Sequence, residues 1–162
     1  MTTADAGLEG IARHGKERPG ALALVLGPER RTYGDLDDRT NRLAHVLRDA
    51  GAHPGTTVAA VLPNGFGRDY EDQIAAVPSD AADLASAASW TPVFYTSGTT
   101  GLPKGVIHGQ FTPEKVRMGQ EEQRLLWSWE PEDVHILSGP AYHAGPGGWT
   151  MTALSSSDTY LK

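Results

Sequence analysis

Residues 94–109 read FYTSGTTGLPKGVIHG, and this segment constrains the fold more than any other part of the chain. The run TPVFYT, which leads into it, is rich in β-branched and aromatic residues and predicts a strand. The glycines that follow let the backbone turn and approach a ligand, while the hydroxyls, backbone N–H groups and lysine ammonium all donate hydrogen bonds. Since ligands of open α/β sheets lie at the carboxyl ends of strands, the segment predicts an α/β fold with an anion site suited to phosphate.

The first 63 residues predict a hairpin, a helix and a further strand. ALALVL at 21–26 and the RTY that follows a GPER turn are the two hairpin strands. Thr32, with Asp35 three residues later, has the spacing of a capping box, and Gly51 is placed to end the helix. TVAAVLP at 57–63 is continuously apolar, which is typical of a strand buried on both faces of a sheet. This order is the opening of an α/β domain.

The pattern weakens between residues 64 and 91, where only one weak helix is predicted, at about 70–77. A buried strand in an α/β domain is normally followed by a helix and another strand of comparable strength, and neither is present here. We therefore interpret 64–91 as a linker across an apparent deletion. It separates a hairpin–helix–strand part, residues 1–63, from a part that contains the glycine loop, residues 92–162.

The second part predicts alternating elements after the loop. Thr112–Pro113 should start a helix that runs to about Trp129, and DVHILSGP should form a strand. The final segment from 141 onward predicts a glycine-rich loop, then an apolar turn or helix, and a last strand.

Composition narrows the classes of partner. Fourteen Lys and Arg against twenty Asp and Glu give a net charge of −6, which argues against a nucleic-acid groove or an anionic membrane surface. The chain has no cysteine, so disulfides and thiolate metal sites are excluded, and the histidines lack the spacing of a metal site. No apolar run is long enough to span a membrane, and we expect a cytoplasmic protein.

The glycine loop is neither a Walker A loop nor a dinucleotide fingerprint, because its spacing fits neither pattern. Taken alone, such a cluster could be an ordinary surface loop. Its residues match place for place, however, the phosphate loop of the adenylate-forming (AMP-binding) superfamily, which the chain resembles. RTYGDLDDRTNRLAHVLRDAGAHPGTTVAAVLPNG is similar to the superfamily's N-terminal entry, and the Tyr-His-Ala-x-Pro segment resembles acyl-CoA synthetases more than peptide-synthetase domains. The matching loop positions are Tyr95, Thr96, Ser97, Gly98, Thr99, Thr100, Gly101, Pro103, Lys104 and Gly105.

The resemblance implies a ligase that activates a small carboxylic acid with ATP and Mg²⁺, then passes the acyl group to coenzyme A, as in fatty acid metabolism. It implies that His143 lies beside the acyl group with Tyr142 and Trp149 as walls, although a capping or core histidine is an equal alternative for His143. It implies no metal ligand and no catalytic residue in this chain. The residues implied to wrap the ATP phosphates are Thr96, Ser97, Gly98, Thr99, Thr100, Gly101 and Lys104.

The chain also departs from the superfamily pattern. Strand–helix units expected between the two parts are missing, as are the adenine segment, the Thr-Glu pair for Mg²⁺, the ribose aspartate and the C-terminal domain with its catalytic lysine. We therefore expect part of the N-terminal domain of an adenylate-forming enzyme, with an incomplete mixed sheet and flanking helices, inactive in isolation. The alternatives are a non-catalytic mini-protein that binds phosphate or a nucleotide, and a non-functional remnant that acts only through protein contacts. Exposed apolar strands also predict self-association.

Overall fold

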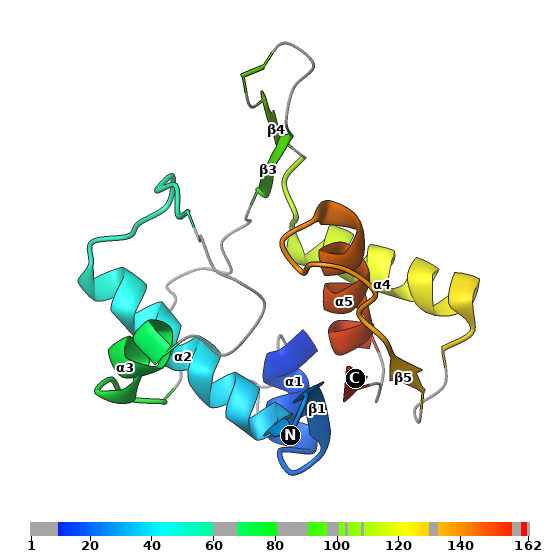
Figure 1. The fold of residues 1–162 in the computed structure, drawn as a ribbon, viewed down its shortest axis with the longest axis horizontal. Coiled ribbons are helices and arrows are strands. Elements are labelled where there is room, and N and C mark those ends of the chain that lie inside the picture. Colours follow the sequence, from blue (N-terminus) through cyan, green and yellow to red (C-terminus); the bar gives the residue numbers. More distant parts are fainter. Residues whose placement is uncertain are drawn as a thin grey trace.

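The structure is a computed structural model that describes residues 10–59, 68–80, 91–96, 101–102, 104–107, 109–129, 133–156 and 160–161. Figure 1 shows α2 and α3 on one side of the molecule, α4 and α5 on the other, α1 and β1 between them, and a hairpin of β3 and β4 that projects away. The elements are α1 (Gly10–Glu17), β1 (Leu22–Leu26), β2 (Glu29–Thr32), α2 (Tyr33–Asp49), α3 (Arg68–Ala75), β3 (Val93–Thr96), β4 (Lys104–Ile107), α4 (Pro113–Trp127), β5 (Val134–His135), α5 (Ala144–Ser156) and β6 (Tyr160–Leu161).

Strands from both ends of the chain form one mixed sheet with the order β2-β1-β6-β5. β1 and β2 are the predicted antiparallel hairpin. β6 pairs in parallel with β1, with Leu24 opposite Leu161, and in parallel with β5, with Val134 opposite Tyr160. The predicted α/β class, with a mixed sheet and flanking helices, is therefore confirmed.

The core joins the two parts that the sequence separated. The buried cluster consists of Ala23, Tyr33, Leu36 and Leu154. Tyr33 is fully buried, and its hydroxyl donates to the Leu154 carbonyl over 3.4 Å. Because Leu154 belongs to α5 and the other three residues to β1 and α2, neither part has this core by itself.

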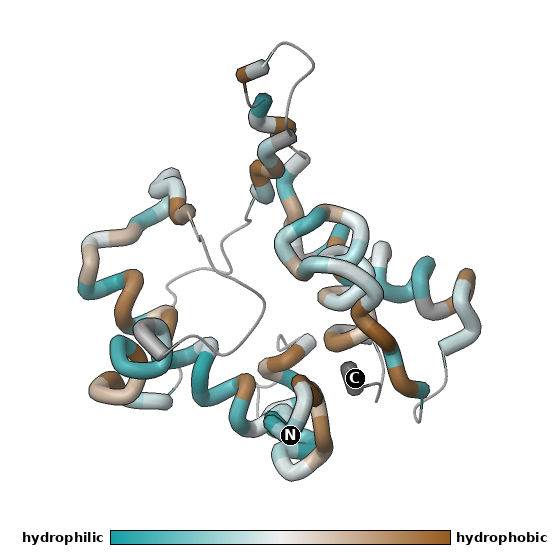
Figure 2. Tube along the Cα trace, viewed as in Figure 1, coloured by the Kyte–Doolittle hydropathy of each residue, from teal (hydrophilic) through white to brown (hydrophobic). Residues whose placement is uncertain are grey.

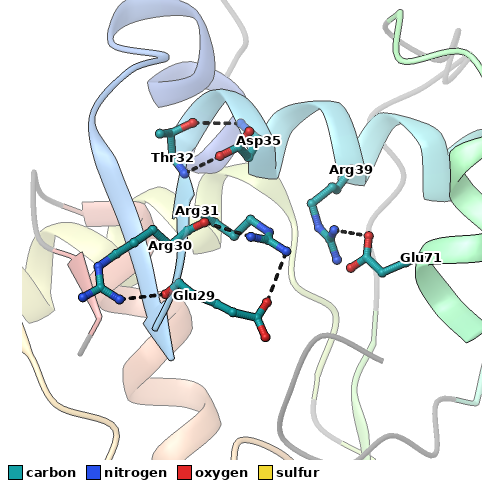
Figure 3. A network of polar contacts seen from close by, with 7 residues as sticks. All are labelled: Glu29, Arg30, Arg31, Thr32, Asp35, Arg39 and Glu71. Atoms are coloured by element: carbon teal, nitrogen blue, oxygen red, sulfur yellow. Dashed lines mark hydrogen bonds and ion pairs between the residues drawn. The ribbon is translucent and has the colours of Figure 1, made fainter. Parts of the chain in front are cut away.

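Helix α2 begins and ends where the sequence predicts. The Thr32 hydroxyl accepts a hydrogen bond from the Asp35 N–H (3.1 Å), and the Asp35 carboxylate accepts one from the Thr32 N–H (2.7 Å), which completes the capping box in Figure 3. At the other end, Gly51 has φ of +86°, a conformation that glycine adopts without strain. The Gly51 N–H donates to the Arg48 carbonyl, and the Ala52 N–H donates to the Leu47 carbonyl. These two hydrogen bonds form a Schellman motif.

Polar contacts hold α3 against α2, because the short helix has little apolar surface to bury. Arg39 forms an ion pair with Glu71, as Figure 3 shows, and its guanidinium also lies 5.2 Å from the Tyr70 ring. One turn further along α2, Arg42 donates to the carbonyl of Val77, just after α3 ends. Ile74, 3% exposed, adds an apolar contact surface to this interface. The weak helix predicted at about 70–77 is confirmed within two residues.

Three sequence-based expectations differ from the structure. Thr57–Ala59, the start of the predicted 57–63 strand, is not in a strand, and the remainder of that segment lies outside the described residues. The strand predicted in DVHILSGP is only Val134–His135. The predicted glycine-rich loop is instead the first turn of α5: a Cβ on Gly147 would lie 2.2 Å from the Ala141 carbonyl oxygen, so its glycine allows the preceding turn to pack on the helix.

Replacing Thr150 with valine is expected to stabilise the fold by about 1 kcal/mol, because a buried hydroxyl without a partner costs free energy and valine has nearly the same shape. Thr150 is 8% exposed, and its Oγ1 has no hydrogen-bond partner within the described part of the chain. Urea unfolding of the two proteins measures the difference. Thr152→Val is the matched control: the Thr152 hydroxyl donates to Gly148 over 2.9 Å, so that variant should gain nothing. A destabilised Thr150→Val protein would contradict the prediction.

Candidate functional site

The glycine loop joins the two strands of an antiparallel hairpin. β3 and β4 pair with Val93 opposite Ile107 and Thr96 opposite Lys104, so residues 97–103 form the connection. The sequence predicted β3, and the structure confirms it at Val93–Thr96. β4 was missed, although the apolar Val106–Ile107 pair after Gly105 was a signal for it.

The hairpin brings the first and last predicted phosphate-binding residues together at the neck of the loop. Thr96 ends β3, and the exposed Lys104 begins β4 directly opposite. Gly101 has φ of +83°, and apart from its chain neighbours no atom of the described residues would lie within 4 Å of a Cβ built on it. The other predicted phosphate ligands, Ser97, Gly98, Thr99 and Thr100, lie outside the described residues.

Two further motif residues face each other across the hairpin. Gly105 lies opposite Tyr95, and a Cβ on Gly105 would be 3.5 Å from the Tyr95 ring and 3.3 Å from Val93 Cγ1. The distance to the Tyr95 ring is an ordinary van der Waals contact, so a Cβ at this position would require only the Val93 side chain to shift slightly.

The predicted acyl-pocket residues fall into two groups. Tyr142 and His143 are exposed neighbours immediately before α5, with ring centroids 4.9 Å apart. Trp149, on α5, instead packs edge-on against Trp127 at the end of α4, with centroids 5.1 Å apart. The exposure of His143 excludes the core alternative. The His143 carbonyl accepts a hydrogen bond from the Gly147 N–H. Two roles therefore stay possible for His143: capping the start of α5, and contact with the acyl group.

The described groups with shifted pKa values lie on α3 and β5, outside the hairpin. Burial raises the pKa of the Tyr70 hydroxyl, a shift that Arg39 opposes and Glu71 adds to. Burial lowers the pKa of His135. Within the described residues, no group of three or more histidine, aspartate or glutamate side chains is placed to hold a metal ion. No helix in the described ranges is long and apolar enough to cross a membrane.

Three comparisons relate this geometry to known proteins. A fatty acid–[acyl-carrier-protein] ligase, ScoC of Streptomyces coeruleorubidus, is 25% identical over 215 positions that take in 91% of this chain and 41% of ScoC. The inhibitor-bound N-terminal domain of FACL13 from Mycobacterium tuberculosis superposes with a TM-score of 0.76 at 17% identity, over 96% of this chain and 57% of that one. ATP-bound MatB from Rhodopseudomonas palustris superposes with a TM-score of 0.67 at 17% identity, over 94% of this chain and 45% of MatB.

The family profile of the AMP-binding enzymes matches residues 11–67, which include α1, the β1–β2 hairpin and α2. The superpositions extend the likeness in fold over nearly the whole chain. The chain spans about two fifths of the curated relative and somewhat more than half of the FACL13 domain. The sequence profile and the curated relative show that this chain belongs to the adenylate-forming, or AMP-binding, enzymes, and its fold is that of part of their N-terminal domain.

Proposed function

We propose that this chain is the phosphate-binding part of an ATP-dependent acid–CoA ligase. The whole enzyme would activate a carboxylic acid as its acyl-adenylate, release pyrophosphate and form an acyl-CoA thioester. The observation that carries the proposal is the geometry of the hairpin loop. Lys104 lies opposite Thr96 where the strands meet the loop, and Gly101 within the loop has a left-handed backbone conformation. Membership of the superfamily supports carboxylate activation, and the ATP-bound MatB structure supports ATP as the nucleotide.

The proposed task of the loop is to bind the β- and γ-phosphates. Negative charge grows on the departing pyrophosphate, so N–H donors and an ammonium already aimed at it lower the barrier. Lys104 would supply the charge, and Gly101 would let backbone N–H groups approach because no side chain stands there. Mg²⁺ would arrive bound to the ATP phosphates and neutralise part of their charge, and no residue of this chain is assigned to it.

The acyl side of the site is proposed at the segment before α5. Tyr142 and His143 would border the carboxylate substrate there, since both are exposed and their rings lie against each other. Trp149 would help to hold α5, and with it the wall of the acyl pocket, against α4, because its ring packs on Trp127. The fatty acid named for ScoC supports an acyl substrate of that class, and a cytoplasmic location remains a prediction.

The 162-residue chain itself is proposed to be inactive, because it covers only part of the enzymes it resembles. The ScoC alignment runs over 215 positions, whereas 91% of 162 residues is about 147, so ScoC has residues within the aligned region that this chain lacks. This difference supports the internal deletion interpreted at 64–91. In the alternative, a phosphate-binding mini-protein without catalysis, the loop would still bind phosphate.

A pyrophosphate titration followed by amide NMR shifts tests the loop. We expect weak, salt-sensitive binding with little preference for adenine, centred on Gly101 and Lys104. Lys104→Ala should weaken binding about fivefold, since an exposed ion pair contributes up to about 1 kcal/mol. Gly101→Val should weaken it further, because a β-branched residue at φ of +83° is strained and its side chain blocks the backbone.

Two matched controls distinguish an effect at the loop from the effect of losing a positive charge, or of backbone strain, elsewhere in the chain. Lys115→Ala removes the same charge from exposed helix α4, and Gly55→Val places the same strain at φ of +94° in a turn outside the loop. Both controls should bind pyrophosphate like the original chain. If no loop amide shifts at millimolar pyrophosphate, or if Lys104→Ala binds as well as Lys115→Ala, the proposed site is wrong.

A further inference from the structure

Residues 68–80, which comprise α3 and the segment that follows it, lie along α2, and we call them the strap. Among the strap side chains that the structure describes, Ile74 alone is buried, and its neighbours Gln73 and Ala75 are exposed. No described residue of the strap belongs to the buried core cluster around Tyr33. Figure 2 shows hydrophilic positions along both helices. The apolar area that holds the strap on α2 is therefore small.

Polar contacts from α2 hold the strap at three points instead. The three side chains follow one another at intervals of three residues, so neighbouring members lie close together on the helix surface. They reach the strap in α3 itself, just after α3, and at the last described residue of the strap. The contacts are the ion pair of Arg39 with Glu71 in Figure 3, the hydrogen bond from Arg42 to the Val77 carbonyl, and the contact of His45 with the Asp80 carbonyl.

A fourth α2 side chain, Arg48, determines how His45 makes its contact. The Arg48 Nη2 atom lies 2.6 Å from His45 Nδ1, and a guanidinium can only donate, so Nδ1 accepts and the imidazole proton is on Nε2. Nε2 therefore donates to the Asp80 carbonyl over 3.0 Å. Because His45 is only 7% exposed, its ring is held in this orientation while the strap is docked.

The helix of the strap depends on these contacts. Isolated helices shorter than about 12–15 residues are marginal in water, and α3 has eight residues. Once the strap leaves α2, α3 has no packing that keeps it helical, and a strap that is not helical no longer presents Glu71 and Ile74 together. Docking and helix formation are thus coupled. Segments with few buried apolar contacts also open at free energies well below that of global unfolding.

We propose that the strap is a conformational device of this fold. It detaches from α2 and loses its helix as one unit, while the core around Tyr33 stays folded. The opening exposes the side of α2 that carries Arg39, Arg42 and His45. Since the strap lies between α2 and β3 in the chain, the opening also releases that connection at the three points where α2 holds it.

Native-state amide hydrogen exchange of the whole chain tests the proposal. The strap reporters are the amides of residues 72–75, which bond within α3, and the core reporter is the Tyr33 amide, which donates to the Ala21 carbonyl over 3.0 Å. In the original chain the strap amides should be at least about tenfold less protected than the Tyr33 amide. Arg39→Glu should lower the strap protection about tenfold further, because Glu71 would then face a like charge, and leave Tyr33 unchanged.

Two more variants separate the opening of one unit from local damage. Exchanging the charges, with Arg39→Glu and Glu71→Arg together, restores the ion pair and should return the strap protection to within about threefold of the original. Arg42→Met removes the donor to the Val77 carbonyl but keeps the apolar stem. It should lower the protection of all the 72–75 amides by one common factor, about fivefold, although Arg42 contacts the strap beyond them.

Arg13→Glu is the matched control. It makes the same charge reversal in the exposed pair of Arg13 with Glu17 on α1, so the strap protection should not change. Strap amides as protected as the Tyr33 amide would overturn the proposal. So would an Arg39→Glu protein whose Tyr33 protection falls by the same factor, a charge exchange that restores nothing, an Arg42→Met protein with unchanged 72–75 amides, or an Arg13→Glu protein that matches Arg39→Glu.

Discussion

Tyr33→Ala is expected to lose about 3–5 kcal/mol of unfolding free energy, the usual cost of removing a buried aromatic ring from a core. Tyr33 is 0% exposed, its ring centroid lies 4.8 Å from that of His14, and the Arg18 guanidinium lies 4.6 Å from its ring. Domains are stable by only about 5–15 kcal/mol, so the loss is a large share of the total. Urea unfolding followed by circular dichroism measures it.

Tyr33→Phe is the control for the ring itself. It keeps the ring and removes the hydroxyl, which donates to the Leu154 carbonyl over 3.4 Å, so it should cost about 1 kcal/mol. Since Tyr33 contacts α5, the alanine variant should also release the α5 and β6 segment, visible as a loss of dispersion in their amide signals. An alanine variant as stable as the phenylalanine one would show that this core does not hold the two ends of the chain together.

The second large effect is an absence of catalysis. The 162-residue chain should show no carboxylate-dependent exchange of pyrophosphate into ATP. A phosphate loop supplies only part of the needed stabilisation, because each missing transition-state donor typically costs about 2.7–4 kcal/mol and several are lacking. Intact ScoC, assayed with a fatty acid, is the positive control. Exchange above background that Lys104→Ala abolishes would refute the proposed inactivity.

Local signals in the sequence were sufficient for several elements. The capping box at Thr32 and the glycine end at Gly51 define α2 through contacts between residues a few positions apart. β3 was predicted from four β-branched and aromatic residues, and α4 from the Thr112–Pro113 start. For the two helices the groups that satisfy the terminal backbone positions are close in the chain, so the sequence pattern already contains the interaction.

For the candidate site, the sequence determined the residue types and their order but not their neighbours. It identified the glycine loop and its lysine, whereas only the folded hairpin shows that Lys104 lies opposite Thr96 and that Gly105 lies opposite Tyr95. Trp149 was predicted, with Tyr142, as a wall of the acyl pocket, and only the fold shows that its ring also packs on Trp127. Contacts between separate helices depend on how the helices dock, which no spacing along one helix specifies.

By itself, then, the sequence determined the superfamily, the α/β class and the ends of the helices whose caps are local. Tertiary structure alone decided that β6 joins β1, that α5 begins within a glycine-rich segment, and that Leu154 completes a core around Tyr33. The physical reason is the distance along the chain. Contacts such as Tyr33 with Leu154 join residues more than a hundred positions apart, and they form only when the apolar area buried across the whole sheet outweighs the entropy of bringing the ends together.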